Sequence, residues 1–201
     1  MCIHLPFDSN KATQLLNYFA IQNGGTISKY KALKLVFFAD RYHLRKYGRP
    51  ITGDEYYAMK NGPVPSGTKD IAEMADDYRK DVVIAYAARF ISALFPVRSL
   101  KSIKAVDFNE LSDSDREALN FAWSKFGHCD DRAIVAKTHD YPEWKKHASA
   151  LQAGRRARMD LIDFLEDPPP PVEPCHPLTE KERSIRRDQL REIHLIEAMW
   201  N

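Results

Sequence analysis

The sequence predicts a helix-dominated α+β fold: a compact helical domain with a small antiparallel sheet or ribbon, followed by a proline-rich spacer and a C-terminal helix. Three observations lead to this prediction. Apolar residues recur at helical spacing through most of the chain. Short stretches rich in tyrosine and β-branched residues lie between glycines and prolines near the middle. A cluster of prolines then interrupts the chain at residues 168–171.

Two helices are expected at the start of the chain. The first covers residues 10–23, where apolar side chains share one face and two glycines follow. The second covers residues 28–47, with Ser28 as its N-cap and an apolar stripe along its whole length. Gly48 lies just beyond it, and Pro50 forbids its continuation.

The middle of the chain combines short strands with one helix. A strand is expected between residues 51 and 63, then a stiff turn at Gly62–Pro65 and a third helix at residues 65–81. Further short strands or a ribbon are expected at residues 82–86, 90–97 and 103–108, with a loop at Arg98–Ser99. A helix is the alternative for the alanine-rich part of this region.

The second half returns to helices. Ser112 can cap a helix whose first turn is acidic and which Gly127 ends. Shorter helices are expected at residues 131–138, 142–150 and 158–165.

The proline cluster divides the chain into three parts, namely a domain at residues 1–166, a spacer at residues 167–177 and a C-terminal helix at residues 178–201. Proline lacks an amide donor, so the spacer is expected to be extended and semi-rigid. Thr179 and Glu182 form a candidate capping pair for the last helix. The helix has an incomplete apolar face, which must cover a surface on this chain or on another, so a homodimer through this helix is one alternative.

Composition limits the class of protein. With 201 residues, 44% apolar and 29% charged, the chain can bury one good core. Its 30 basic and 28 acidic residues nearly cancel, whereas nucleic-acid-binding proteins usually carry a strongly basic face. Three widely spaced cysteines argue against a secreted disulfide framework, so a cytoplasmic location is expected. Neither a signal peptide nor a membrane-spanning segment is predicted.

Several motifs carry a family resemblance. They are Lys31–Leu44, Gly48–Asp54, Gly62–Pro65, Leu111–Asp115 and Thr138–Trp144. Together they resemble the Panacea, or SocA-like, antitoxin domain family over roughly residues 10 to 165. The resemblance implies a helix-rich, non-enzymatic cytoplasmic domain from a bacterium or its phages and prophages. Such a domain pairs with a toxin, expected to be encoded by an adjacent gene, and neutralises it by direct binding. Because the family partners many unrelated toxins, the resemblance does not name this one.

The candidate partner-binding residues come from the densest stretch of charged and aromatic side chains. Tyrosine and arginine are the residue types that concentrate interface energy. The candidates are Arg41, His43, Arg45, Arg49, Asp54, Tyr56, Tyr57 and Lys60.

Asp40 is expected to have a structural role, because it lies within the apolar stripe of the second helix. A buried carboxylate needs a cation or backbone donors. The candidate cations are Arg41, Arg45, Arg49 and Lys60, and an ion pair that holds the second helix to the strand is the favoured arrangement.

Two other functions remain open. The first two helices resemble a helix-turn-helix that would present Ser28, Lys29, Lys31 and Lys34 to DNA, as in a transcriptional regulator of its own operator. Asp40 and His43, three residues apart on one helix, would with Thr52 imitate a hydrolytic site, although no recognisable nucleophile motif is present. The spacing of histidines and cysteines does not match a metal site, and no cofactor is expected.

Overall fold

The computed structural model describes residues 5–74, 81–95 and 98–200. Its larger helices are α1 (Ser9–Gln22), α2 (Lys29–Tyr47), α5 (Asp113–Phe126), α6 (Asp131–Thr138) and α9 (Glu180–Trp200). Shorter helices are α3 (Ser66–Ala72), α4 (Asp81–Ala87), η2 (Phe108–Glu110), α7 (Pro142–Lys145), α8 (Ala148–Gln152) and η3 (Leu161–Leu165). The strands are β1 (Thr26–Ser28), β2 (Tyr56–Met59), β3 (Gly62–Pro65), β4 (Ile91–Leu94), β5 (Ser99–Ser102) and β6 (Ala157–Arg158). The predicted helix-dominated α+β fold is confirmed.

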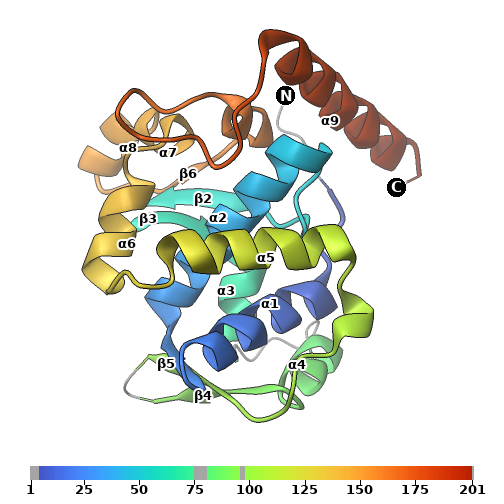
Figure 1. The fold of residues 1–201 in the computed structure, drawn as a ribbon, viewed down its shortest axis with the longest axis vertical. Helices are drawn as coiled ribbons and strands as arrows, with labels where there is room; N and C mark the ends of the chain where they lie inside the picture. The colour runs from blue at the N-terminus through green and yellow to red at the C-terminus, as the bar shows by residue number, and fades with distance from the viewer. Residues whose placement is uncertain (1–4, 75–80, 96–97, 201) are drawn as a thin grey trace.

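Helix α2 is the centre of the molecule (Figure 1). Every residue from 32 to 45 is buried, because α1, α5, α6 and α9 surround the helix together with β1 and β3. Ser28 accepts a hydrogen bond from the Lys31 amide at the start of α2, and Gly48 ends it in the left-handed conformation. Both ends are therefore specified by local chemistry.

The strands form two separate antiparallel sheets of three strands. One has the order β1-β5-β4, with Ile27 opposite Leu100, and the other has the order β3-β2-β6, with Tyr57 opposite Val64. The predicted turn at Gly62–Pro65 is in fact β3. Two prolines are tolerated in this strand because β3 lies at the edge of its sheet.

Other predictions in the middle of the chain were wrong. Residues 82–86 belong to helix α4, not to a strand. Strand β5 begins at Ser99, where a loop was expected, while no strand forms at residues 103–108. Helix α3 ends at Ala72, and residues 75–80, which the third helix was expected to include, lie outside the described part. Residues 158–165 form the end of β6 and the 3-10 helix η3.

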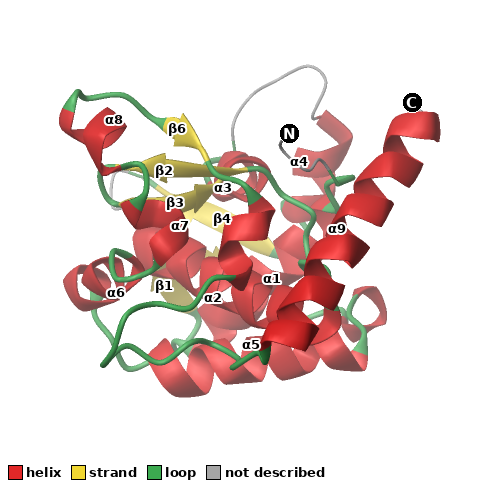
Figure 2. Ribbon diagram, turned by 90° about the horizontal axis from the view of Figure 1, so that it is seen from above, coloured by secondary structure: helices red, strands yellow, loops and turns green. Residues whose placement is uncertain are grey.

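The proline-rich segment and α9 pack against the rest of the chain rather than extending away from it. Cys175 and Leu190 are buried. The Arg186 guanidinium donates to the backbone carbonyls of Arg45 and Lys46 at the C-terminal end of α2, where helix carbonyls lack partners. Figure 2 shows α9 on the outer side of the molecule, opposite β6 and α8. The segment that sequence analysis interpreted as a spacer is thus a packed part of this fold.

Candidate partner-binding groove

Asp40 holds the segment that follows α2. Its carboxylate accepts hydrogen bonds from the Ile51 amide (2.7 Å), the Thr52 hydroxyl (2.7 Å) and the Tyr56 hydroxyl (2.9 Å), and a longer one from the Thr52 amide. Burial raises the pKa of this carboxyl to about 6, although the four hydrogen bonds oppose the shift. The favoured ion pair was wrong, because backbone and hydroxyl donors, and none of the four candidate cations, hold Asp40.

Asp54 has a comparable role at the next helix. Its carboxylate accepts from the amides of Gly67 (2.9 Å) and Thr68 (2.7 Å) and from the Thr68 hydroxyl (2.7 Å). These amides belong to the first turn of α3, where backbone donors lack partners within the helix. The Asp54 side chain is therefore directed into the fold.

Arg41 and Arg45 bind the second half of the chain to α2. The Arg41 Nε atom lies 2.7 Å from Glu143 Oε1, and its Nη2 donates to the Glu166 carbonyl. Arg45 donates to the carbonyls of Leu165 (2.7 Å) and His176 (2.5 Å) and pairs with Asp167. Both arginine side chains are fully buried. Burial and the neighbouring Arg41 charge lower the pKa of Arg45 to about 10.

His43 is buried on another side of α2. Its Nδ1 lies 2.7 Å from the Arg49 carbonyl, which can only accept, so Nδ1 carries the proton. Its Nε2 is 2.9 Å from the Ser114 hydroxyl and 3.3 Å from Asp115. Burial lowers the His43 pKa, consistent with a neutral ring. Since Asp40 binds Thr52 and Tyr56 instead, the Asp40–His43 pair of the hydrolase alternative does not form.

The structure therefore divides the eight candidate contact residues into two groups. Arg41, His43, Arg45, Asp54 and Tyr56 are buried, so their side chains are not presented at the surface. Arg49, Tyr57 and Lys60 retain exposed atoms. Tyr57 lies under the Arg156 guanidinium, 5.0 Å from its ring centre. Arg49 lines a cavity of about 550 Å³ beside the N-terminal segment and α9.

Lys60 lines the larger groove, which we call the basic groove. It has a volume of about 890 Å³ and lies between the N-terminal half of α2, the β2–β3 turn, α3 and the end of β4. Its lining residues are Lys29, Tyr30, Leu33, Lys34, Met59, Lys60, Asn61, Val64, Lys69, Glu73, Phe95 and Arg98. Among these described residues five are cationic and one is acidic. Cations therefore dominate the charged residues that line the basic groove, and Lys60, one of the candidate contact residues, is among them.

Lys34 is the buried cation of the basic groove. Only 1% of its surface is exposed, and Nζ donates to the Pro63 carbonyl at 2.6 Å. Gly62 lies against the same side chain, and a Cβ there would collide with Thr138 and crowd the Lys34 Nζ. Burial lowers the Lys34 pKa to about 7. The β2–β3 turn thus closes over an ammonium group at the wall of the groove.

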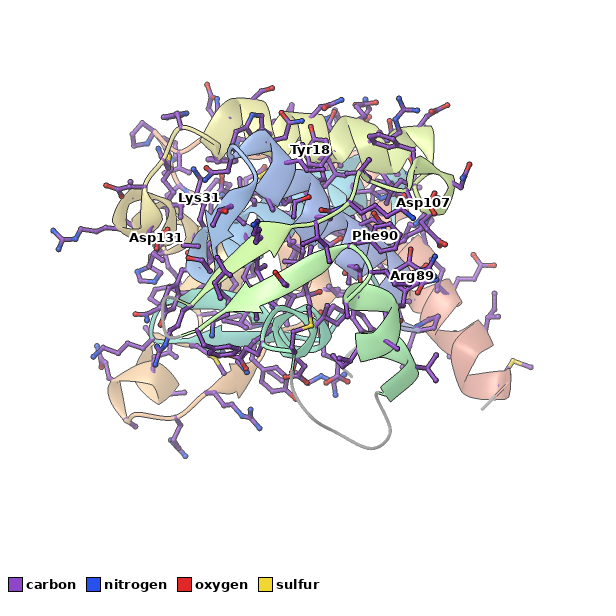
Figure 3. All side chains as sticks on the ribbon, turned by 90° about the horizontal axis from the view of Figure 1, so that it is seen from below. Tyr18, Lys31, Arg89, Phe90, Asp107 and Asp131 are labelled. Carbon is purple, nitrogen blue, oxygen red and sulfur yellow. The ribbon has the colours of Figure 1, made fainter. Side chains whose placement is uncertain are left out.

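The helix-turn-helix prediction does not match this arrangement. Only 1% of the Lys34 surface is exposed and its Nζ donates to the Pro63 carbonyl, while Ser28 donates to Asp131 of α6. Lys31 donates to Asn23 (2.8 Å) and lies beside Asp131, as Figure 3 shows. Burial lowers the Lys31 pKa, against the opposing effect of Asp131. Helix α2 is surrounded by other elements, so it cannot enter a DNA groove as a recognition helix.

Most of the basic groove was not predicted from the sequence. Lys29 and Lys34 were considered only as DNA contacts, while Tyr30, Phe95 and Arg98 were not considered as binding residues. One signal was available: Lys34 lies four residues after Tyr30 and three before Phe37, within the apolar stripe of α2. The same reasoning that identified Asp40 as buried applies to Lys34.

Two further properties concern the described part of the chain. Among the described residues, no three or more histidine, cysteine, aspartate or glutamate side chains lie together in a way that could hold a metal ion. Its helices, α9 included, are too short or too polar to cross a membrane.

Comparison with known proteins matches the chain to a protein-family model. No curated protein and no solved structure matches this chain. The family model described as "Antitoxin SocA-like, Panacea domain" matches residues 33–145, more than half of the 201 residues. The matched region includes α2 from Leu33 onward, the β2–β3 hairpin and α5 to α7, and it contains the lining residues of the basic groove other than Lys29 and Tyr30. The chain belongs to the SocA-like Panacea antitoxin family.

Proposed function

We propose that this protein is an antitoxin that binds a cognate toxin directly and suppresses it by occlusion or by holding it in an inactive shape. Membership of the Panacea antitoxin family supports the general role. The proposed partner is a protein encoded by a neighbouring gene, and the proposed location is the cytoplasm. The protein itself performs no chemical step in this proposal.

The observation that carries the proposal is that polar residues between positions 40 and 54 bind other parts of the same fold. Asp40, Arg41, Arg45 and Asp54 form hydrogen bonds and ion pairs within the fold, where they join α2 to the segments that follow it. Such a network fixes the body of the protein and, through Tyr56 and Thr68, the start of β2 and of α3 beside the basic groove. A pre-shaped surface loses little conformational entropy on binding, which favours tight association with a partner.

The test is controlled co-expression. The product of the adjacent gene is induced alone and together with this protein, and colony counts and co-purification are measured. We expect the neighbour to stop growth alone, and we expect this protein to restore growth and to co-purify with it. A neighbour that is harmless alone, or that remains lethal beside this protein, would contradict the proposal.

A second arm addresses regulation of an operator. The purified protein is mixed with its own promoter fragment at increasing salt concentration. Salt-sensitive, sequence-specific retention without rescue from the toxin would replace the antitoxin proposal with a regulatory one.

A further inference from the structure

We propose that the basic groove receives an acidic segment of the toxin, one carboxylate of which binds the Lys34 ammonium. The proposal rests on the proposed antitoxin function and adds the place of contact and the chemistry of the partner. An acidic peptide segment is the occupant that the charges and the apolar lining of the groove favour.

The charge balance of the groove is the first argument. Glu73 is the one acidic residue among the described lining residues. Its two carboxylate oxygens are already bound by Lys29 (2.5 Å) and Lys69 (2.6 Å). No carboxylate in the described lining is then left for Lys34, Lys60 or Arg98. An acidic partner would supply the missing negative charge, which is the usual form of electrostatic complementarity at an interface.

Lys34 supplies the second argument. An ammonium group has three N–H donors, and the described structure provides one strong acceptor, the Pro63 carbonyl. Keeping such a group buried without an opposite charge is costly. Burial is the cause of the lowered Lys34 pKa, with no carboxylate acting against it. A carboxylate entering the groove would relieve this cost, so the free protein is poised for an anionic contact.

The apolar part of the groove distinguishes a peptide from a nucleic acid. Leu33, Met59, Val64 and Phe95 line it beside the cations, and 72% of the Phe95 surface is exposed. Apolar side chains of a peptide can cover these residues, whereas the phosphate backbone of a duplex, whose bases are stacked inside, cannot. The near-zero net charge of the chain also differs from the strongly basic footprint of nucleic-acid binding. The volume of the basic groove, about 890 Å³, lies within the range of pockets that hold small ligands, so the groove has room for a few side chains.

The direct test uses labelled hexaglutamate as the probe, with hexaglutamine as the uncharged control, and measures fluorescence polarisation at low salt. We expect hexaglutamate to bind and hexaglutamine not to bind. Lys34→Met removes the buried ammonium while keeping an unbranched side chain, and Lys60→Glu reverses an exposed charge without disturbing the core. Each is expected to weaken binding about tenfold or more. Lys181→Glu on the exposed face of α9 makes the same charge change outside the groove and should bind like the parent.

A second readout is specific to Lys34. The NMR signal of its ε-carbon is followed against pH with and without hexaglutamate. A bound carboxylate favours the charged amine, so the Lys34 pKa should rise when the probe binds. Equal binding of the two peptides, or an unchanged affinity of Lys34→Met and Lys60→Glu, would overturn the inference. A duplex DNA that binds this groove while hexaglutamate does not would overturn it as well.

Co-expression separates this inference from the proposed function. If the parent protein protects cells from the toxin and Lys34→Met and Lys60→Glu lose protection while Lys181→Glu keeps it, both are supported. If all three variants protect equally, the groove is not the contact surface, but the antitoxin function stands. If the parent fails to protect although hexaglutamate binds at Lys34, the groove is a site for acidic peptides. The proposal that a segment of the toxin occupies it is then refuted.

Discussion

Arg41 and Glu143 are 102 positions apart in the sequence, yet Arg41 Nε lies 2.7 Å from Glu143 Oε1, and neither side chain is exposed. The Arg41 guanidinium also lies 4.5 Å from the centre of the Tyr141 ring. Arg41 Nη1 and Glu143 Oε2 have no hydrogen-bond partner among the described atoms. The pair therefore joins α2 to α7 at a high desolvation cost, and its two members depend on each other.

Removing one member of this pair should be far worse than removing both. Arg41→Met leaves the Glu143 carboxylate buried without its cation, for which about 3–5 kcal/mol of destabilisation is expected. The double variant Arg41→Met/Glu143→Leu removes both charges and should regain most of that loss. Urea unfolding of the parent, both single variants and the double variant measures the coupling. Additive losses would show that the two residues are independent.

The hydrogen bonds of Asp40 lead to a second prediction. Asp40→Ala leaves the Ile51 amide and the Thr52 and Tyr56 hydroxyls without their acceptor inside the protein. Each buried unpaired group costs about 1–3 kcal/mol, so the variant should lose about 3 kcal/mol or more in unfolding free energy. Tyr56→Phe removes one donor together with its need for a partner and should cost only about 1 kcal/mol. Chemical denaturation measures the loss of unfolding free energy in each variant, provided that the m value is unchanged. Equal losses for Asp40→Ala and Tyr56→Phe would argue against this network.

Lys34 makes stability depend on pH in a defined window. Its pKa is about 7 in the folded protein against 10.5 in the unfolded chain, so the unfolded state binds more protons between these values. The unfolding free energy should therefore rise as pH increases from 7 towards 10.5. His139, the neighbouring titratable group, has a pKa lowered from 6.5 by burial and by Lys34, and so titrates below this window.

The variant Lys34→Met isolates this effect. It should be more stable than the parent at pH 7, because the parent carries the cost of a buried charge that amounts to several kcal/mol by linkage. The difference should shrink as pH rises to 9. Thermal melting at pH 7, 8 and 9 checks it, with Lys181→Glu as the surface control. A constant difference across this range would show that Lys34 does not titrate there.

The elements that could be predicted are those with local signals at both ends. Helix α2 was predicted at residues 28–47 and observed as Lys29–Tyr47 because Ser28 and Gly48 act within one helical turn. Strand β5 was missed because it depends on pairing with β1, more than 70 residues earlier in the chain. The apolar residues 82–86 fit a strand pattern equally well, but they form the helix α4. Local sequence does not contain the partner that decides between such alternatives.

The candidate site shows the same limit. The stretch that contains Arg41, Arg45 and Asp54 was selected for its density of charged and aromatic residues, and these three side chains were interpreted as surface contacts. Their partners are backbone groups, the carboxylates of Glu143 and Asp167 and the Thr68 hydroxyl, and no local pattern indicates that these segments fold back onto them. The Lys34 environment likewise depends on how the β2–β3 turn folds back. Residues that bind distant backbone are difficult to distinguish from residues that bind another protein.

The packing of α9 gives the last prediction. Leu190 is fully buried against the body of the protein, whereas 59% of the Leu195 surface is exposed five residues further along the same helix. Leu190→Ala should lower the unfolding free energy by about 2–4 kcal/mol, because it leaves a cavity. Leu195→Ala makes the same chemical change on the exposed side and should stay within about 0.5 kcal/mol of the parent.

Urea denaturation of the two variants decides whether α9 belongs to the folding unit. If only Leu190→Ala lowers the unfolding free energy, the helix unfolds together with the body of the protein. The hydrogen bonds from Arg186 to the end of α2 indicate this outcome. Truncation after residue 167 should then destabilise the whole protein, since it also removes the His176 carbonyl from the buried Arg45. Two variants with parental stability would mean that α9 is an appendage, and its apolar face would then be available to a second copy of the chain.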